Sequence, residues 1–338
     1  MLETFPIIGG GPAGAAAALA VARAGGRPLI YEKSSLPRHK LCGEFFSPET
    51  LAALDRIGAA EGFLRLRPAR VSHAELHFAK HRRRFALPEP GYGLSRYAFD
   101  DFLLRAAVGH GAELRRERVI NPTGPAVWAI GRSIVSPRGR RAFGFKAHYS
   151  GRPNDAVELY FFPGGYCGLC PIEGGKTNVC GLAGEDLLGR YSFQVDRLTE
   201  TVPRLRERLA PLARESPWHV AGPLRFGPAP RPQGALLAAG DAACFADPFT
   251  GSGLLAAVQT GAWAGAALLE AAQGARWSNC CSHHSRFCSS FFRTQLATTA
   301  IIRRLLSLGW VEQLAGLVPG SLLFRLTRPA SRRVYNSD

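Results

Sequence analysis

Two glycine-rich motifs far apart in the chain, each accompanied by a carboxylate, have the residue types of a cofactor-binding site. In "IIGGGPAG", Gly9, Gly11 and Gly14 form a G-x-G-x-x-G pattern between a strand and an Ala-rich helix. In that setting the first glycine permits a tight turn, the second lets a diphosphate approach the backbone, and the third lets helix and strand pack closely. Glu32 ends the next predicted strand, where a carboxylate can accept hydrogen bonds from an adenosine ribose.

The second cluster, "GDAACFADPFTGSG", indicates which dinucleotide such a site would hold. A buried strand over residues 234–239 would deliver Asp241 to the ligand-binding edge of a parallel sheet, where it can accept a hydrogen bond from a ribitol hydroxyl. Residues 250–253 open a long helix whose amides and positive dipole end suit the N1/C2=O edge of a flavin. Because an NAD dehydrogenase needs no second clamp, Glu32 and Asp241 together predict FAD. The alternative for Asp241 is a plain helix cap.

Alternating apolar residues predict an antiparallel sheet between the two clusters. Leu76 and Phe78 on one strand match Phe85 and Leu87 on the return, which indicates a hairpin. The stretch "AVELYFFPGGYCGLCPIEGGKTNVCGLAG" predicts three more strands joined by glycine-rich turns. The apolar run over residues 253–272 is rich in Ala and Gly, which favours a helix packed closely on a sheet over a membrane span.

The motifs "IIGGGPAG", "YEK", "PRHKLCGE", "LSRYAFDDFLLRAA" and "GDAACFADPFTGSG" resemble those of the geranylgeranyl reductase-like family of FAD-dependent oxidoreductases. The resemblance implies an α/β fold: a Rossmann-type FAD-binding domain with a parallel sheet, an inserted antiparallel-sheet substrate domain and C-terminal helices. We expect the FAD-binding domain at residues 1–70, 91–140 and 220–275, the substrate domain at 71–90 and 141–219, and the C-terminal helical region at 276–338.

The glycine clusters and the resemblance together give the expected cofactor-binding residues. They are Gly9, Gly11, Pro12, Ala13, Gly14, Glu32, Lys33, Cys42, Gly43, Arg96, Val119, Asp241, Pro248, Gly251, Gly253 and Leu254. Between residues 120 and 141 the chain is shorter than in related flavoproteins, which place a β-meander there. The FAD-binding domain is therefore expected to be trimmed. This weakens a hydroxylase interpretation and makes impaired FAD binding an alternative.

The family's substrate cavity is lined by a strand with the pattern Y-x-W-x-F-P, which reads "YCGLCP" in this chain. The expected cavity residues are therefore Tyr166, Gly168 and Cys170, with the tryptophan replaced by Gly168 and the phenylalanine by Cys170. Loss of two rings predicts a wider cavity that would accept a bulkier or more ring-like compound than a slim isoprenoid chain. Flavin halogenases need W-x-W-x-I-P and a catalytic lysine, and neither tryptophan is present, so halogenation does not fit.

The charge balance favours acidic partners. Lys and Arg total 42 against 26 acidic residues, a net charge of +16. Such a surface would attract an acidic electron carrier or an anionic membrane face, on which the Arg-rich residues 296–334 could rest. No nucleic-acid-binding signature accompanies the charge. The N-terminal segment shows no basic leader, so we expect a cytoplasmic protein with reduced thiols. Cys167 and Cys170 should point to opposite faces of one strand, so no metal site is predicted.

These observations predict an FAD-dependent oxidoreductase acting on a hydrophobic small molecule, with hydride transfer to a C=C bond. Cys42, Glu44 and Tyr166 are the candidate catalytic residues that would supply the proton. The reductant would be NAD(P)H or an acidic electron carrier. One alternative is an FAD-dependent monooxygenase of an aromatic or polyketide-type substrate, and a second is a non-catalytic flavin electron-transfer protein.

Overall fold

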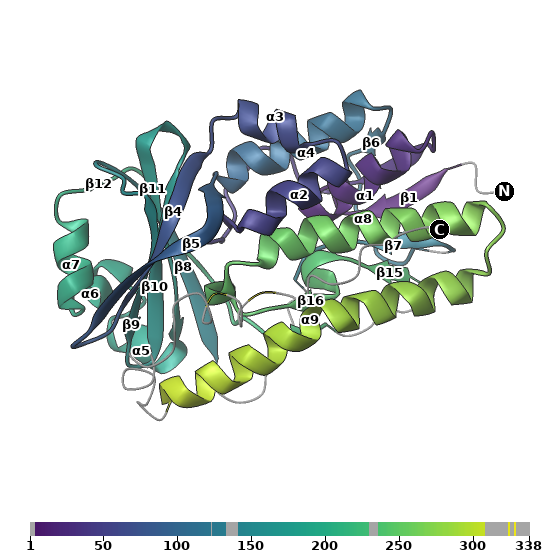
Figure 1. The fold of residues 1–338 in the computed structure, drawn as a ribbon. Coiled ribbons are helices and arrows are strands. Elements are labelled where there is room, and N and C mark those ends of the chain that lie inside the picture. Colours follow the sequence, from purple (N-terminus) through teal and green to yellow (C-terminus); the bar gives the residue numbers. More distant parts are fainter. Residues whose placement is uncertain are drawn as a thin grey trace.

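The computed structural model describes residues 4–122, 124–132, 141–229 and 236–307, together with Phe324 and Arg328. Two main β-sheets stand side by side in this part of the chain, and helices pack on the outside of each (Figure 1). The smaller sheet has five strands in the order β15-β7-β1-β2-β6, and all its pairings are parallel. The larger sheet has nine strands and is mainly antiparallel. The predicted fold class is confirmed.

The parallel sheet is built from short apolar strands, as expected for strands covered on both faces. They are β1 (Phe5–Ile8), β2 (Pro28–Tyr31), β6 (Glu113–Arg115), β7 (Ala126–Trp128) and β15 (Leu236–Ala238). The strand predicted at 234–239 therefore corresponds to β15, and residues 234 and 235 lie outside the described part. The segment after β7 carries Arg132 to the carboxyl edge of this sheet.

Three helices cover one side of the parallel sheet: α1 (Pro12–Arg23), α4 (Arg96–Gly109) and α8 (Gly253–Ala272). Helices α1 and α8 approach so closely that a Cβ on Gly261 would lie 2.1 Å from the Ala13 carbonyl oxygen, and one on Gly265 2.6 Å from the Ala17 carbonyl oxygen. By length and composition α8 could cross a membrane, but most of it is buried in this packing. The Ala- and Gly-rich sequence thus serves helix-to-helix contact.

The large sheet alternates between two faces. Its strands are β3 (Phe45–Phe46), β4 (Ala69–His77), β5 (Arg82–Gly93), β8 (Ala142–Ser150), β9 (Ala156–Phe162), β10 (Gly165–Ile172), β11 (Lys176–Gly184), β12 (Ala213–Arg214) and β13 (His219–Ala221). Helices α5 (Glu185–Arg190), α6 (Val195–Glu200) and α7 (Pro203–Leu209) form a core with one face, here called the back face. The opposite face, the front face, looks toward the parallel sheet.

The predicted hairpin and three-strand segment are both present: β4 pairs with β5, and β9, β10 and β11 pair in succession. As the alternation predicted, Cys167 lies in the back-face core and Cys170 among the front-face residues. Strand β3 and the last two residues of β13 join the large sheet, although they fall within the ranges expected for the FAD-binding domain. The domain bounds stay a prediction.

The remaining elements connect or cover the two sheets. They are α2 (Pro48–Arg56), α3 (Ala60–Arg65), the pair β14 (Gly227–Pro228) and β16 (Cys244–Phe245), and α9 (Trp277–Ser307). Helix α9 runs along the edge of the parallel sheet, where His284 Nε2 lies 2.7 Å from the Ala238 carbonyl oxygen of β15. The C-terminal helical region expected from residue 276 thus begins with α9, and most of its later residues lie outside the described part.

Candidate functional site

A cavity of about 1400 Å³ lies between the carboxyl ends of the parallel strands and the front face of the large sheet. All of the expected cofactor-binding residues except Gly14 line it. Tyr166, Gly168 and Cys170 line it from β10. The two glycine clusters, which are more than 200 residues apart, therefore line the same cavity. This agrees with the general observation that ligands of open α/β sheets bind at the carboxyl ends of the parallel strands.

The β1–α1 turn shows why each glycine is needed. Gly9 has a φ of +106°, and a Cβ there would lie 2.3 Å from the Ala129 carbonyl oxygen. A Cβ on Gly14 would lie 1.8 Å from the Gly9 carbonyl oxygen, so this glycine serves packing and does not face the cavity. Around Gly11 the nearest atom to such a Cβ is Lys40 Nζ at 3.8 Å. That open cradle at the start of α1 is where a diphosphate would approach the backbone.

Glu32 is fixed at the carboxyl end of β2. Its Oε2 accepts a hydrogen bond from the Gly10 amide and its Oε1 one from the Ser34 amide, both at 2.8 Å. The residue is 7% exposed and lines the cavity beside Lys33 and Val119. The carboxylate is thus held in one orientation, with lone pairs left for the hydroxyls of a ribose.

A buried charge cluster stands next to the diphosphate cradle. Lys40 Nζ lies 2.6 Å from Asp100 Oδ2, and Arg96 donates to both oxygens of Asp100 at 2.6 and 2.8 Å. The Asp100 side chain is fully buried, and burial lowers the pKa of Lys40. Two cations therefore share one carboxylate, which leaves one positive charge in surplus beside the amides of α1. A diphosphate, with two negative charges, fits this surplus.

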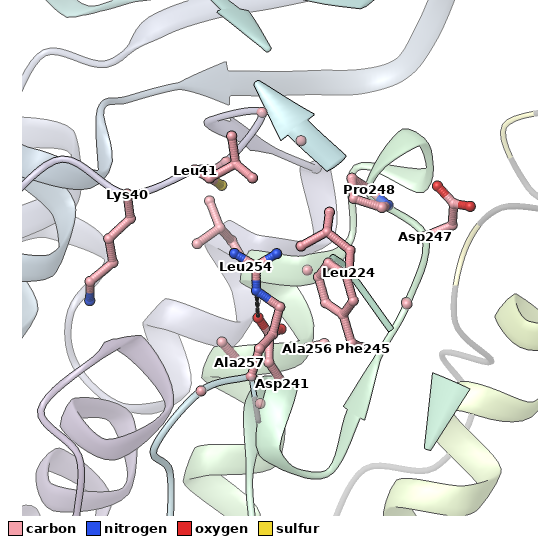
Figure 2. Close-up of a pocket in the computed structure, with 18 of the residues that line it drawn as sticks. Lys40, Leu41, Leu224, Asp241, Phe245, Asp247, Pro248, Leu254, Ala256 and Ala257 are labelled. Carbon is pink, nitrogen blue, oxygen red and sulfur yellow. Dashed lines mark ion pairs between the residues drawn. The ribbon is translucent and has the colours of Figure 1, made fainter. Parts of the chain in front are cut away.

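Asp241 lies where the second glycine cluster predicted a ribitol ligand. Its Oδ2 is 3.9 Å from Arg132 Nε, and the Arg132 guanidinium stands 4.9 Å over the ring of Phe245. Figure 2 shows the Asp241 carboxylate in the pocket, with Lys40 extending on one side of the site and Asp247 on the other. Among the described helices Asp241 caps none, whereas Asp247 accepts a hydrogen bond from the Phe249 amide. This geometry favours a ligand role for Asp241 over the helix-cap alternative.

Residues 247–253 form the loop that opens α8. Gly251 has a φ of +63°, and the space around a Cβ on Gly253 is open to 4 Å. Thr250 Oγ1 and Ser252 Oγ are 2.8 Å apart, and Gln295 of α9 donates a hydrogen bond to Ser252 Oγ. Hydrogen bonds thus hold the loop, and Gly253 and Leu254 at the start of α8 line the cavity. Taken with the cradle at Gly11 and the surplus charge, the residues present fit FAD.

Glu44 is held in an ionic network, which argues against its expected role as proton donor. The residue is completely buried, and its carboxylate accepts hydrogen bonds from Lys146 Nζ at 2.5 Å and His148 Nε2 at 2.7 Å. Its Oε1 also accepts from the Arg96 amide at 2.7 Å. Burial opposes ionisation, but the bond from His148 and the charge of Lys146 lower the pKa of Glu44 below its usual range. An ionised, fully bonded carboxylate cannot give a proton.

Cys42 and Tyr166, the other two catalytic candidates, both line the cavity. Cys42 is half-buried, and its sulfur accepts a hydrogen bond from the Glu44 amide at 3.4 Å. The Tyr166 hydroxyl lies 3.5 Å from Asp247 Oδ1, and its ring meets Phe249 edge to face. Tyr166 is the candidate that combines a proton-bearing group with a buried acidic neighbour at the front face.

The part of the front face that lines the cavity is almost entirely apolar. It is lined by Ala74, Leu76, Phe85, Leu87, Val157, Leu159, Phe161, Tyr166, Gly168, Cys170, Cys180 and Leu182. A Cβ on Gly168 would lie 3.2 Å from Leu159 Cδ2, so the leucine of the neighbouring strand takes part of the volume that loss of the tryptophan was expected to leave vacant. Such a wall suits a hydrophobic substrate, because it offers few groups that would need a polar partner.

A cluster of residues whose side chains can bind a metal ion lies on the back face. Ligand atoms of Glu75, His77 and Glu158 are within 4.8 Å of one another. Glu75, however, pairs with Arg82 and Arg84, and Glu158 accepts from Arg208, Asn154 and Tyr160. The carboxylates are already neutralised, so the cluster links β4, β5, β9 and α7 rather than offering open ligands.

Sequence reasoning missed several residues around the cavity. Lys40 lies in the motif "PRHKLCGE" and Asp247 in "GDAACFADPFTGSG". Their charged side chains within motifs already assigned to cofactor binding were the signal that could have identified them. Lys146, His148 and Arg328 come from other segments and had no local signal, because they reach the site only through the fold.

Comparisons with known proteins agree with this geometry. Residues 2–120 match the FAD binding domain family. A digeranylgeranylglycerophospholipid reductase of Methanopyrus kandleri is 29% identical over 308 residues, which cover 78% of this chain and 76% of that protein. A menaquinone reductase of Mycolicibacterium smegmatis is 30% identical over 115 residues, or 32% of this chain. This match spans 27% of the menaquinone reductase, about a quarter of its length.

Solved structures show the same fold. A flavin-dependent brominase superposes with a TM-score of 0.76 at 18% identity, covering 96% of this chain and 92% of that chain. The myxobacterial chondrochloren halogenase superposes with a TM-score of 0.74 at 20% identity, covering 88% and 82%. At these identities the likeness concerns the fold alone. The FAD binding domain match and the reductase relatives confirm the resemblance that the motifs indicated.

Proposed function

We propose that this FAD-dependent oxidoreductase catalyses hydride transfer to a carbon–carbon double bond of a hydrophobic, isoprenoid-containing molecule. The observation that carries the proposal is the continuity of one cavity, which runs from the FAD-fitting turns to the apolar front face. Relatives named as reductases of a geranylgeranyl lipid and of menaquinone support this substrate class.

FAD, when bound, supplies the hydride. The chain's own residues hold the substrate against the front face, exclude water and provide the proton that completes the saturated bond. We assign that proton to the Tyr166 hydroxyl, with Asp247 beside it, and keep the Cys42 thiol as the competing donor. A tyrosine that has given its proton must be reprotonated before the next turnover.

The source of electrons and the cell context are part of the proposal. The reductant is NAD(P)H or an acidic electron carrier that the +16 charge would attract. We propose a cytoplasmic protein with peripheral membrane contact, because a hydrophobic substrate is concentrated in lipid. No nucleic acid is proposed as a partner.

The main alternative is an FAD-dependent monooxygenase of an aromatic or polyketide-type substrate. Gly168 favours it, since a glycine in the cavity wall leaves room for a ring system even with Leu159 beside it. A non-catalytic flavin electron-transfer protein is the second alternative, and reduction of the flavin without any substrate turnover would point to it.

Product mass decides between these functions. The purified protein is loaded with FAD and reduced, then mixed with digeranylgeranylglycerophospholipid or menaquinone. Gain of two hydrogens supports reduction, and gain of one oxygen in air supports the monooxygenase. Tyr166→Phe should abolish turnover and leave the flavin spectrum unchanged. Cys42→Ala should retain turnover. The reverse pattern would assign the proton to Cys42, and absence of a flavin spectrum after FAD addition would refute the whole proposal.

A further inference from the structure

Arg328 brings a buried positive charge to the cavity from the C-terminal part of the chain. The residue is 9% exposed and lines the cavity together with Phe324. Its Nη2 donates a hydrogen bond to the Thr250 carbonyl oxygen, and its guanidinium stands 4.3 Å over the Phe324 ring. A cation so far from water is costly, and a nearby negative charge lowers that cost.

Glu49 is a carboxylate near Arg328. Its Oε2 lies 3.9 Å from Arg328 Nη1, which is too long for a hydrogen bond, and the Glu49 side chain is 34% exposed. Burial lowers the pKa of Arg328 to about 10. Because that value is above neutrality, the guanidinium stays charged at pH 7.

The charge stands next to the start of α8. Arg328 Nη2 lies 3.9 Å from the position of a Cβ on Gly251, and α8 begins two residues later at Gly253. The positive end of a 20-residue helix and a buried guanidinium therefore converge on the same corner of the cavity. The corner is also rigid, because Gln295 and Arg328 both donate hydrogen bonds to residues of the 247–253 loop.

We propose that Arg328 stabilises negative charge on FAD bound at the start of α8, so that reduced FAD gives up its second proton at a lower pH than it would without this cation. The inference rests on the FAD site of the proposed function. Two-electron reduction of a flavin proceeds with uptake of one proton or of two, and a fixed cation in a dry site favours the form with the additional negative charge. Arg328 would thereby change the acidity of the reduced cofactor from outside the FAD-binding motifs.

The test uses the full-length protein loaded with FAD. The bound flavin is reduced with light, and its absorbance is titrated with acid and base to obtain the pKa of the reduced form. Arg328→Met should raise this pKa by one unit or more, a tenfold change in proton affinity. Arg328→Lys, which keeps the charge, should shift it less. The exposed Arg293→Met on α9 serves as the matched control and should leave the value unchanged.

The outcomes separate this inference from the proposed function. If Arg328→Met weakens FAD binding or thermal stability while the pKa of the reduced flavin stays at the wild-type value, Arg328 only supports the loop and the inference is wrong. If wild-type protein binds no FAD, the cofactor assignment fails and the inference fails with it. If FAD binds and the pKa shifts as expected while no double bond is reduced, the inference stands and the proposed reaction falls.

Discussion

Single residues are expected to decide how the cavity binds each part of FAD. Asp241, Lys40 and Glu32 come from three different segments and suit three chemically distinct groups: a ribitol hydroxyl, a diphosphate and a ribose. Because these groups are separate parts of one cofactor, each contact can be removed without the others.

Asp241→Ala should weaken FAD binding by about 10- to 150-fold. This corresponds to about 1.5–3 kcal/mol, the usual range for hydrogen bonds that involve a charged group. Fluorescence titration of the apoprotein with FAD measures the change. Asp186→Ala at an exposed position of α5 is the control. Equal FAD affinity in the two variants would mean that Asp241 has only a local structural role.

Lys40→Met should weaken FAD binding roughly tenfold, because it removes the surplus positive charge beside the start of α1. Riboflavin lacks the diphosphate, so its affinity should be the same in the variant and the wild type. The dependence of FAD affinity on salt should also fall. Lys176→Met, a surface residue paired with Glu215, is the matched control. A parallel loss of riboflavin affinity would mean that Lys40 acts through folding.

At the scale of elements, the loop at residues 40–44 is tied to strand β8 by the Glu44 network. Lys146 and His148 both belong to β8, and both donate to Glu44. Asn178 of β11 adds a hydrogen bond to the Cys42 carbonyl oxygen at 3.0 Å. The network therefore fixes the cavity loop to the large sheet.

Glu44→Gln should destabilise the protein by about 3–5 kcal/mol at pH 7, because it leaves the Lys146 ammonium buried without its counter-charge. The pKa of Glu44 is lowered in the fold. Its contribution is therefore present above the usual glutamate pKa of about 4.3 and is lost as the pH falls toward the folded value. Urea unfolding at pH 7 and pH 4 should show a smaller difference between variant and wild type at pH 4. A constant difference would contradict the charge argument.

The close packing of α1 against α8 places both glycine clusters at the same edge of the parallel sheet. Gly261→Ala should destabilise the fold by about 1–3 kcal/mol and weaken FAD binding, since its Cβ would lie 2.1 Å from the Ala13 carbonyl oxygen and force the helices apart. Thermal unfolding and FAD titration check this. Gly189→Ala on α5, where nothing lies within 4 Å, should change neither quantity. Unaltered FAD affinity in Gly261→Ala would show that the helix spacing is adjustable.

At the scale of the whole molecule, the substrate space exists only because the two sheets face each other across the cavity. Gly168→Trp should fill part of that space and displace Leu159, which lies 3.2 Å from the position of the new Cβ. We expect loss of turnover on the native substrate with the bound-flavin spectrum intact. Gly109→Trp at an open helix position is the control. Full activity in Gly168→Trp would mean that the substrate does not occupy the front face.

The sequence by itself determined the local parts of this protein. The turn at Gly9 to Gly14, the acid at Glu32, the loop that opens α8 and the alternation of β10 are each encoded within a few neighbouring residues. Backbone conformation and strand periodicity depend on such short-range chemistry, so the residue pattern alone predicts these parts. The fold class and the FAD site followed from them.

Only the tertiary structure decided how the charges are distributed. Glu44 and Lys146 are 102 residues apart in the chain, Lys40 and Asp100 are 60 apart, and Arg328 and Thr250 are 78 apart. No local pattern indicates such pairs, because an ion pair needs proximity in space and leaves no periodicity in sequence. The network that removed Glu44 from the proton donors, and the contacts that brought Arg328 to the cavity, therefore depend on how the sheets and helices pack together.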